Sequence, residues 1–80
     1  MQFRVQNYGR DSSHARVLIK INRKRYPCIF NFEEESVLVR NENTKKVKEK
    51  IIRELSVLGW NDITFVDNTI YKRLSKQCTY

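Results

Sequence analysis

The sequence has few of the residues on which most catalytic and metal-binding sites depend. It contains one histidine, His14, and two cysteines, Cys28 and Cys78, which are 50 positions apart. There is no Cys-x-x-Cys pair, and no second histidine is available for a two-histidine metal site. Phosphate-binding glycine loops and the nucleophile elbow of hydrolases are absent as well. We therefore predict a protein that is not an enzyme, with no catalytic residue, no cofactor and no metal.

The chain also lacks long apolar runs, and it has only one proline and two glycines. A membrane-spanning helix needs about 18 apolar residues in a row. The N-terminal stretch alternates in polarity, unlike the apolar segment of a signal peptide. We expect no membrane partner and a cytoplasmic location, which for a viral protein is the host cytoplasm. The 80 residues should form one compact domain, 1–80, with 75–80 as a mobile tail.

Acidic residues are the minority, and they are unevenly placed. The net charge is +7, with seven basic side chains and one acid in residues 1–25 and a surplus of three positive charges in residues 43–58. Between them lies the acidic run Glu33–Glu35. Consecutive strand residues point to opposite faces, so we interpret this run as a solvated turn and not as a metal site. The overall charge indicates a polyanionic partner, either nucleic acid or an acidic protein surface.

Alternation of apolar and polar residues predicts four strands in the first half of the chain. Polar turns separate them, which implies antiparallel pairing. The predicted strands cover residues 1–8, 15–22, 26–32 and 37–40. The inward side chains should be Phe3, Val5, Val17, Ile19, Ile21, Tyr26, Cys28, Phe30 and Phe32. We expect Phe30 to be buried against a helix, in contact with Ile51 or Leu55.

Helical spacing follows the fourth strand. An apolar stripe at this spacing predicts a helix that begins after Asn43 or Thr44 as the N-cap and stops at Gly59. The stripe consists of Val47, Ile51, Ile52, Leu55 and Leu58.

Beyond this helix, residues 63–66 are predicted as a strand. Residues 69–73 either return as its hairpin partner through the Asp67-Asn68 turn or begin a short helix at Thr69, so 69–77 stay open. The fold class is α+β: a two-layer fold with an antiparallel sheet of four to six strands and one amphipathic helix packed on one face, in the order ββββαββ.

Basic residues gather at two predicted positions. The helix starts with lysines, although the positive end of its dipole prefers acids, and free N–H groups together with ammonium groups favour an arriving phosphate or carboxylate. The second position is the polar hairpin between the second and third strands. The candidate anion-binding residues are Lys45, Lys46, Lys50 and Arg53 on the helix and Arg23, Lys24 and Arg25 on the hairpin.

The outward face of the sheet mixes cations with aliphatic side chains, so it is a possible partner-facing surface. The C-terminal hairpin, a second subunit in a homodimer or another partner would cover it. Its candidate residues are Arg4, Tyr8, Leu18, Lys20, Ile29, Leu38 and Arg40.

The stretch SSHARVLIKIN, two further strands and the helix ending IIRELSVLGW resemble the HicA-type messenger-RNA interferase toxins. That family has a double-stranded-RNA-binding-like fold and a Gly-Ser-His motif with a catalytic histidine, which the resemblance maps to Ser12, Ser13 and His14. Here Ser12 replaces the glycine, and a strand is predicted at 1–8 where the family has a helix. His14 as a turn residue is the alternative. The lysines of TKKVKEK are similar in composition to those with which double-stranded-RNA-binding domains hold phosphates.

Three functions remain in ranked order. The first is a small, basic, non-enzymatic module that binds nucleic acid through the lysine-rich helix start and the basic hairpin. The second is a virus- or mobile-element-encoded inhibitor of the anti-CRISPR or anti-restriction type, which binds a host protein complex; small size and a highly charged surface are typical of such proteins. The third is a HicA-like ribonuclease toxin.

Overall fold

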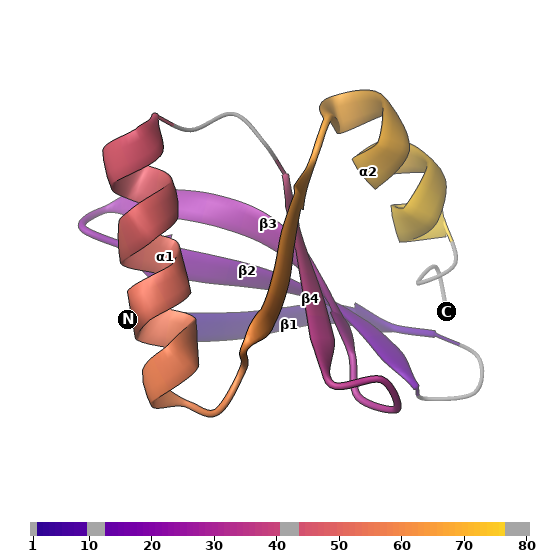
Figure 1. Cartoon of the computed structure of the whole chain (residues 1–80). Coiled ribbons are helices and arrows are strands. Elements are labelled where there is room, and N and C mark those ends of the chain that lie inside the picture. The colour runs from indigo at the N-terminus through magenta and orange to yellow at the C-terminus, as the bar shows by residue number, and fades with distance from the viewer. Residues whose placement is uncertain (1, 10–12, 41–43, 77–80) are drawn as a thin grey trace.

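The computed structural model describes residues 2–9, 13–40 and 44–76 of the chain. A five-stranded sheet in the order β1-β2-β3-β4-β5 forms the middle layer, with α1 on one side and α2 on the other (Figure 1). We call these two sides of the sheet the α1 face and the α2 face. The elements are β1 (Gln2–Tyr8), β2 (His14–Ile21), β3 (Lys24–Asn31), β4 (Ser36–Arg40), α1 (Lys45–Val57), β5 (Asp62–Val66) and α2 (Asn68–Ser75).

Strands β1 to β4 pair antiparallel with their sequence neighbours, as the short turns predict. β5 instead pairs with β4 in parallel, so the sheet is mixed. The reason is that α1 carries the chain back to the end of the sheet where β4 began. A strand that follows such a crossover helix runs in the same direction as the strand before the helix. The predicted α+β class and the number of strands are confirmed.

The connection between β2 and β3 is a two-residue turn. Both of its residues, Asn22 and Arg23, have positive φ angles, of 50° and 70°. Two consecutive positive φ values are the mark of a type I′ turn, whose twist matches that of the flanking strands. The hairpin predicted at this position is confirmed, and its turn places a bulky arginine where glycine is the usual residue.

Helix α1 begins at Lys45 and ends before Gly59, as predicted. Gly59 has φ 94°, and its N–H donates to the Ser56 carbonyl, while the Trp60 N–H donates to the Leu55 carbonyl. These two bonds form a Schellman motif, which satisfies carbonyl groups that the end of a helix leaves without partners. Thr44 is the N-cap, but its side chain makes no capping bond. The alternative cap at position 43 lies outside the described residues.

The main core lies between α1 and the α1 face of the sheet. Phe30 is 4% exposed and belongs to the same buried cluster as Ile51 and Leu55, which confirms its predicted environment. Its ring meets the Trp60 ring edge to face, with 4.8 Å between centroids. The other buried members are Ala15, Val17, Ile19, Ile21, Tyr26, Cys28, Val37 and Val39.

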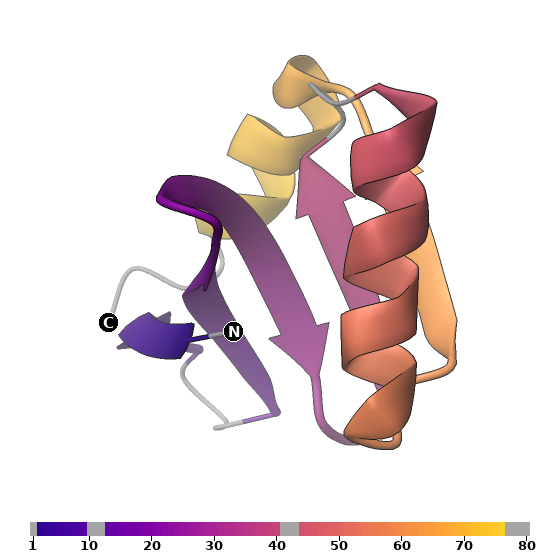
Figure 2. The same ribbon diagram turned by 90° about the vertical axis from the view of Figure 1, so that its left-hand side faces the viewer.

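Several residues predicted to be inward are half-exposed. Phe3 and Val5 pair with the buried Ile19 and Val17 and so share the α1 face, but they lie on the edge strand β1, away from the helix (Figure 2). A helix about 10 Å wide cannot cover five strands at 4.8 Å spacing. The core prediction was also wrong for three other residues, which are exposed: Phe32, Ile52 and Leu58.

Residues 68–75 form the helix α2, which was one of the two alternatives for this segment. The Asp67 carboxylate accepts a bond from the Ile70 N–H at 2.9 Å and caps the helix. α2 packs on the α2 face of the sheet, where Tyr71 and Ile29 are buried against each other. Leu38, Val66 and Leu74 pack around this pair. α2 therefore adds a helix on the side of the sheet opposite α1, and it covers part of the face for which the C-terminal segment, a second subunit or another partner had been left open.

The predicted mobile tail, residues 75–80, overlaps the last residue of α2. Ser75 is buried in the last turn of α2, where its hydroxyl donates to the Lys72 carbonyl. Residues 77–80, including Cys78, lie outside the described residues. Neither α1 nor α2 has the length and apolar character that crossing a membrane requires.

Candidate anion-binding groove

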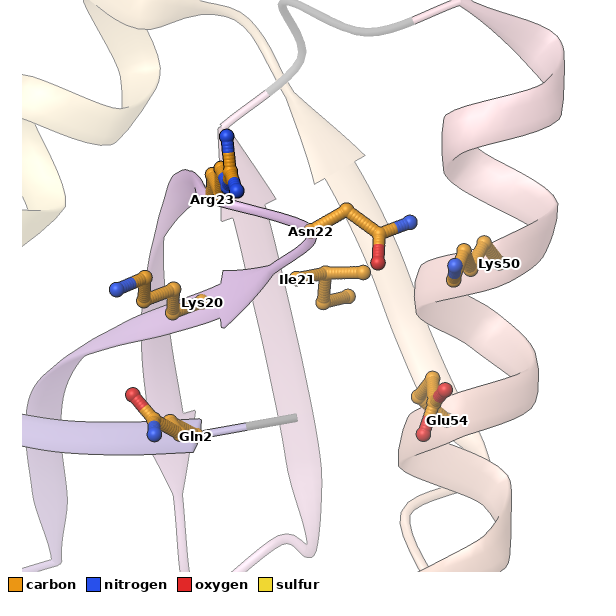
Figure 3. Close-up of a pocket in the computed structure, with 7 residues that line it drawn as sticks. All are labelled: Gln2, Lys20, Ile21, Asn22, Arg23, Lys50 and Glu54. Atoms are coloured by element: carbon orange, nitrogen blue, oxygen red, sulfur yellow. The ribbon is translucent and has the colours of Figure 1, made fainter.

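A groove runs between the tip of the β2–β3 hairpin and the part of α1 from Val47 to Glu54 (Figure 3). Two pockets of about 240 and 220 Å³ form it, and both are lined by Ile21, Asn22 and Lys50. In the close-up, the Ile21 side chain points from the hairpin toward the helix, and Asn22 extends toward Lys50. The residues that define this basic groove are Gln2, Lys20, Ile21, Asn22, Arg23, Lys24, Tyr26, Val47, Lys50 and Glu54.

The charge of the basic groove is strongly one-sided. Its lining cations are Arg23, Lys24 and Lys50, together with Lys20, whose ammonium group extends away from α1 in Figure 3, whereas Glu54 is the one carboxylate among its lining residues. The cations come from three different elements and from the turn between two of them. Cations gathered along a hollow surface strengthen the local positive potential, which attracts anionic groups. The groove thus joins the hairpin with Lys50 of α1, although the hairpin and the helix were predicted as two separate sites.

A third pocket, of about 150 Å³, continues the basic surface around the end of β1. It shares Gln2 and Lys20 with the groove, and it adds Arg4 and Arg25. Arg25 pairs with Lys20 across the β2–β3 ladder, so its side chain belongs to the α2 face. Of the three predicted hairpin residues, Arg23 and Lys24 line the groove, while Arg25 faces the opposite side of the sheet.

The start of α1 adds positive charge beside the groove. Lys45 and Lys46 are exposed in the first turn, which contains no acidic residue. Lys48 is different, because its ammonium group lies over the Phe65 ring at 5.4 Å from the centroid, a cation–π contact. Arg53 is exposed farther along the helix and does not line the groove. Of the predicted helix residues, Lys50 is the one that faces the hairpin.

The predicted sheet surface divides into two parts. Ile29 and Leu38 are covered by α2, and the Arg40 guanidinium lies 6.0 Å from the centre of the Tyr71 ring. A homodimer was predicted because aliphatic residues on this face were expected to be uncovered. For Ile29 and Leu38 this reason no longer holds. Arg4, Leu18 and Lys20 remain together around the third pocket.

Tyr8 lies on the other face from the one predicted. A register shift between Val5 and Asn7 interrupts the alternation of β1, and Tyr8 pairs with Ala15, a residue of the α1-face core. Directly paired residues in antiparallel strands point to the same side of the sheet. A bulge of this kind adds one residue to one strand, and strand alternation alone does not reveal it.

His14 is held by neighbouring side chains. Its Nδ1 atom lies 2.8 Å from the Ser13 hydroxyl oxygen, and its Nε2 atom lies 3.1 Å from the Asn31 amide nitrogen. Asn31 in turn accepts a bond from the Glu34 N–H at 2.9 Å. His14 therefore links the start of β2 to the turn after β3. Ser12, the first residue of the toxin-like motif, lies outside the described residues.

The basic groove is the main candidate for a functional site. Among the described residues, no group of three or more His, Cys, Asp or Glu is arranged to hold a metal ion. No protein family model matches the chain, and no curated protein or solved structure is significantly similar to it.

Proposed function

We propose that the protein is a non-enzymatic binding module that holds the phosphate backbone of a nucleic acid in the basic groove. The observation that carries this proposal is that Arg23 and Lys24 of the hairpin and Lys50 of α1 line two adjoining pockets, with Lys50 in both. Lys45 and Lys46 extend this surface at the helix start, where backbone N–H groups also favour anions. The net charge of +7 adds long-range attraction to any polyanion.

Salt dependence gives the size of the expected effect. Each phosphate neutralised by a lysine or arginine releases condensed counterions, with a slope of about −0.9 per contact in log K against log salt for duplex DNA and about −0.7 for single strands. Three groove cations, Arg23, Lys24 and Lys50, therefore predict a total slope of roughly −2 to −3. A slope near zero would mean that phosphates are not bound.

The test compares two double variants that carry the same change in charge. Arg23→Gln with Lys50→Gln removes two cations of the groove, whereas Lys72→Gln with Arg73→Gln removes two exposed cations of α2, on the other side of the sheet. Binding of fluorescein-labelled duplex DNA, duplex RNA and single-stranded RNA is measured by anisotropy between 25 and about 200 mM salt, a range in which counterion release changes affinity strongly. The groove variant should bind more weakly and with a slope about 1.5–2 less steep, while the α2 variant should keep the slope of the unmodified protein.

Two outcomes would contradict the proposal. One is the absence of binding to all three probes even at the lowest salt concentration. The other is an equal loss in both double variants, which would mean that net charge alone attracts the nucleic acid and that the groove has no special part.

A further inference from the structure

The strand β1 has one edge without a partner strand among the described residues. It is the first strand of the sheet order, pairs with β2 on one side and is seven residues long. An exposed edge presents a row of unpaired N–H and C=O groups, and proteins usually protect such edges with proline, charged side chains, a bulge or a covering loop. β1 contains no proline, and its regular part, from Gln2 to Val5, precedes the register shift.

The α1-face side of this edge is apolar and open. Phe3 is 43% exposed and Val5 is 45% exposed. Phe3 is nevertheless fixed, because its ring meets the buried Phe30 ring edge to face, with 6.1 Å between centroids. A half-exposed apolar pair beside an open strand edge is a surface that an added strand would cover.

The α2-face side of the same edge is basic. The pocket there is lined by Arg4, Lys20 and Arg25 together with Gln2, Phe3 and Leu18, and no carboxylate is among these residues. A second copy of this chain would bring Arg4 and a net charge of +7 toward an identical surface, which electrostatic repulsion opposes. Charge complementarity selects an acidic partner instead.

We propose that β1 binds an extended acidic segment of another protein by strand addition. Successive side chains of a strand point to opposite faces. Apolar residues of the added segment would then cover Phe3 and Val5, and the carboxylates between them would lie beside Arg4 and the pocket that contains Lys20 and Arg25. The bulge after Val5 ends the regular edge, so the segment pairs with about four residues. This proposal does not depend on nucleic-acid binding in the basic groove.

The probe is a seven-residue peptide of alternating glutamate and valine with blocked ends. Three control peptides accompany it: one with lysine in place of glutamate, and two whose backbone nitrogens are methylated at either the valines or the glutamates. Methylation removes the donors of one edge of the peptide strand, so one of the two methylated peptides should lose binding. The amide signals of the isotope-labelled protein are followed by NMR during titration, together with their hydrogen exchange.

The expected result is a set of shifts at residues 2–5 with slower amide exchange there, no binding of the lysine peptide, and loss of binding for one methylated peptide. Arg4→Gln should weaken the affinity about two- to fivefold, because one exposed charge pair is lost, and Lys72→Gln should not. Equal binding of both methylated peptides, shifts confined to the basic groove or no binding at millimolar peptide would overturn the proposal. A dimer in light scattering that disappears with Arg4→Glu would overturn it too, because a second copy would then occupy the edge.

Discussion

Arg23 is the residue at which folding and binding are expected to make opposite demands. It is the second residue of the type I′ turn and has φ 70°, in the left-handed region. The steric conflict of a side chain in this region costs about 1–2 kcal/mol, and glycine avoids it. Asn22, the first turn residue, has φ 50°, which asparagine tolerates better than most residues do.

Replacing Arg23 with glycine should therefore stabilise the fold. Relief of the left-handed strain contributes about 1–2 kcal/mol, and the larger entropy of glycine in the unfolded chain removes about 0.5–1 kcal/mol of this. The net gain is about 0–1.5 kcal/mol, with a midpoint of about 0.8, which for a domain of this size raises the melting temperature by about 3–6 °C. The change is measured by thermal and urea unfolding.

The same substitution should weaken nucleic-acid binding and reduce the salt slope by about 0.7–0.9, the contribution of one phosphate contact. Arg23→Lys is the matched control, because it keeps both the charge and the strained backbone and should leave stability and slope nearly unchanged. Refutation would be an Arg23→Gly protein that is less stable than the unmodified one, since the turn would then not be strained. Unchanged affinity and slope would instead separate Arg23 from the binding surface.

Three further predictions concern the helix start and the core. The double substitution Lys45→Glu with Lys46→Glu should leave stability unchanged or raise it by roughly 0.3–1 kcal/mol per site, because acidic residues suit the first turn of a helix. It should also flatten the salt dependence of nucleic-acid binding. Lower stability in urea unfolding would mean that the lysines are structural. Phe30→Ala should lower the unfolding free energy by about 3–5 kcal/mol, and an unchanged urea midpoint would contradict the core assignment. Burial raises the pKa of the Cys28 thiol, so in a Cys78→Ser variant thiol reagents should label Cys28 only through unfolding, and rapid labelling in native buffer would refute this. The unfolding free energy should also fall as pH rises past the ordinary thiol pKa of about 8.5, because the unfolded chain then releases the thiol proton that the folded chain keeps.

Most of the sheet and the main helix could be predicted from local patterns. Alternation located β1 to β4, and helical spacing with Gly59 located α1. The direction of β5 required the further rule that a strand after a crossover helix runs parallel to the strand before it. α2 carried a usable signal as well, because Asp67 is a favoured N-cap residue and Ile70 and Leu74 are four positions apart. A five-residue window was too short to separate this helix from a strand.

The candidate site could be predicted only in its parts. Arg23, Lys24 and Lys50 were visible as residues of basic stretches, whereas Lys20 was predicted on the sheet surface. The meeting of the hairpin with Lys50 depends on where α1 crosses the sheet. Periodicity shows which side of a helix is apolar and says nothing about which strands it covers. The same limit explains Phe3 and Val5, whose alternation is that of core residues although α1 leaves them half-exposed.

Departures from the usual rules of stability are concentrated at one end of the molecule. Arg23 occupies a glycine-like position, Thr44 makes no capping bond at a helix start that lacks acids, and Phe3 stays half-covered on an open edge. Elsewhere Asp67 caps α2 and Gly59 ends α1 in a Schellman motif, while Glu35, in the turn between β3 and β4, also has a positive φ, of 55°. Local conflicts of this kind are expected at functional surfaces. Stability and binding should therefore respond in opposite directions to substitutions at this end, and in the same direction to substitutions in the core.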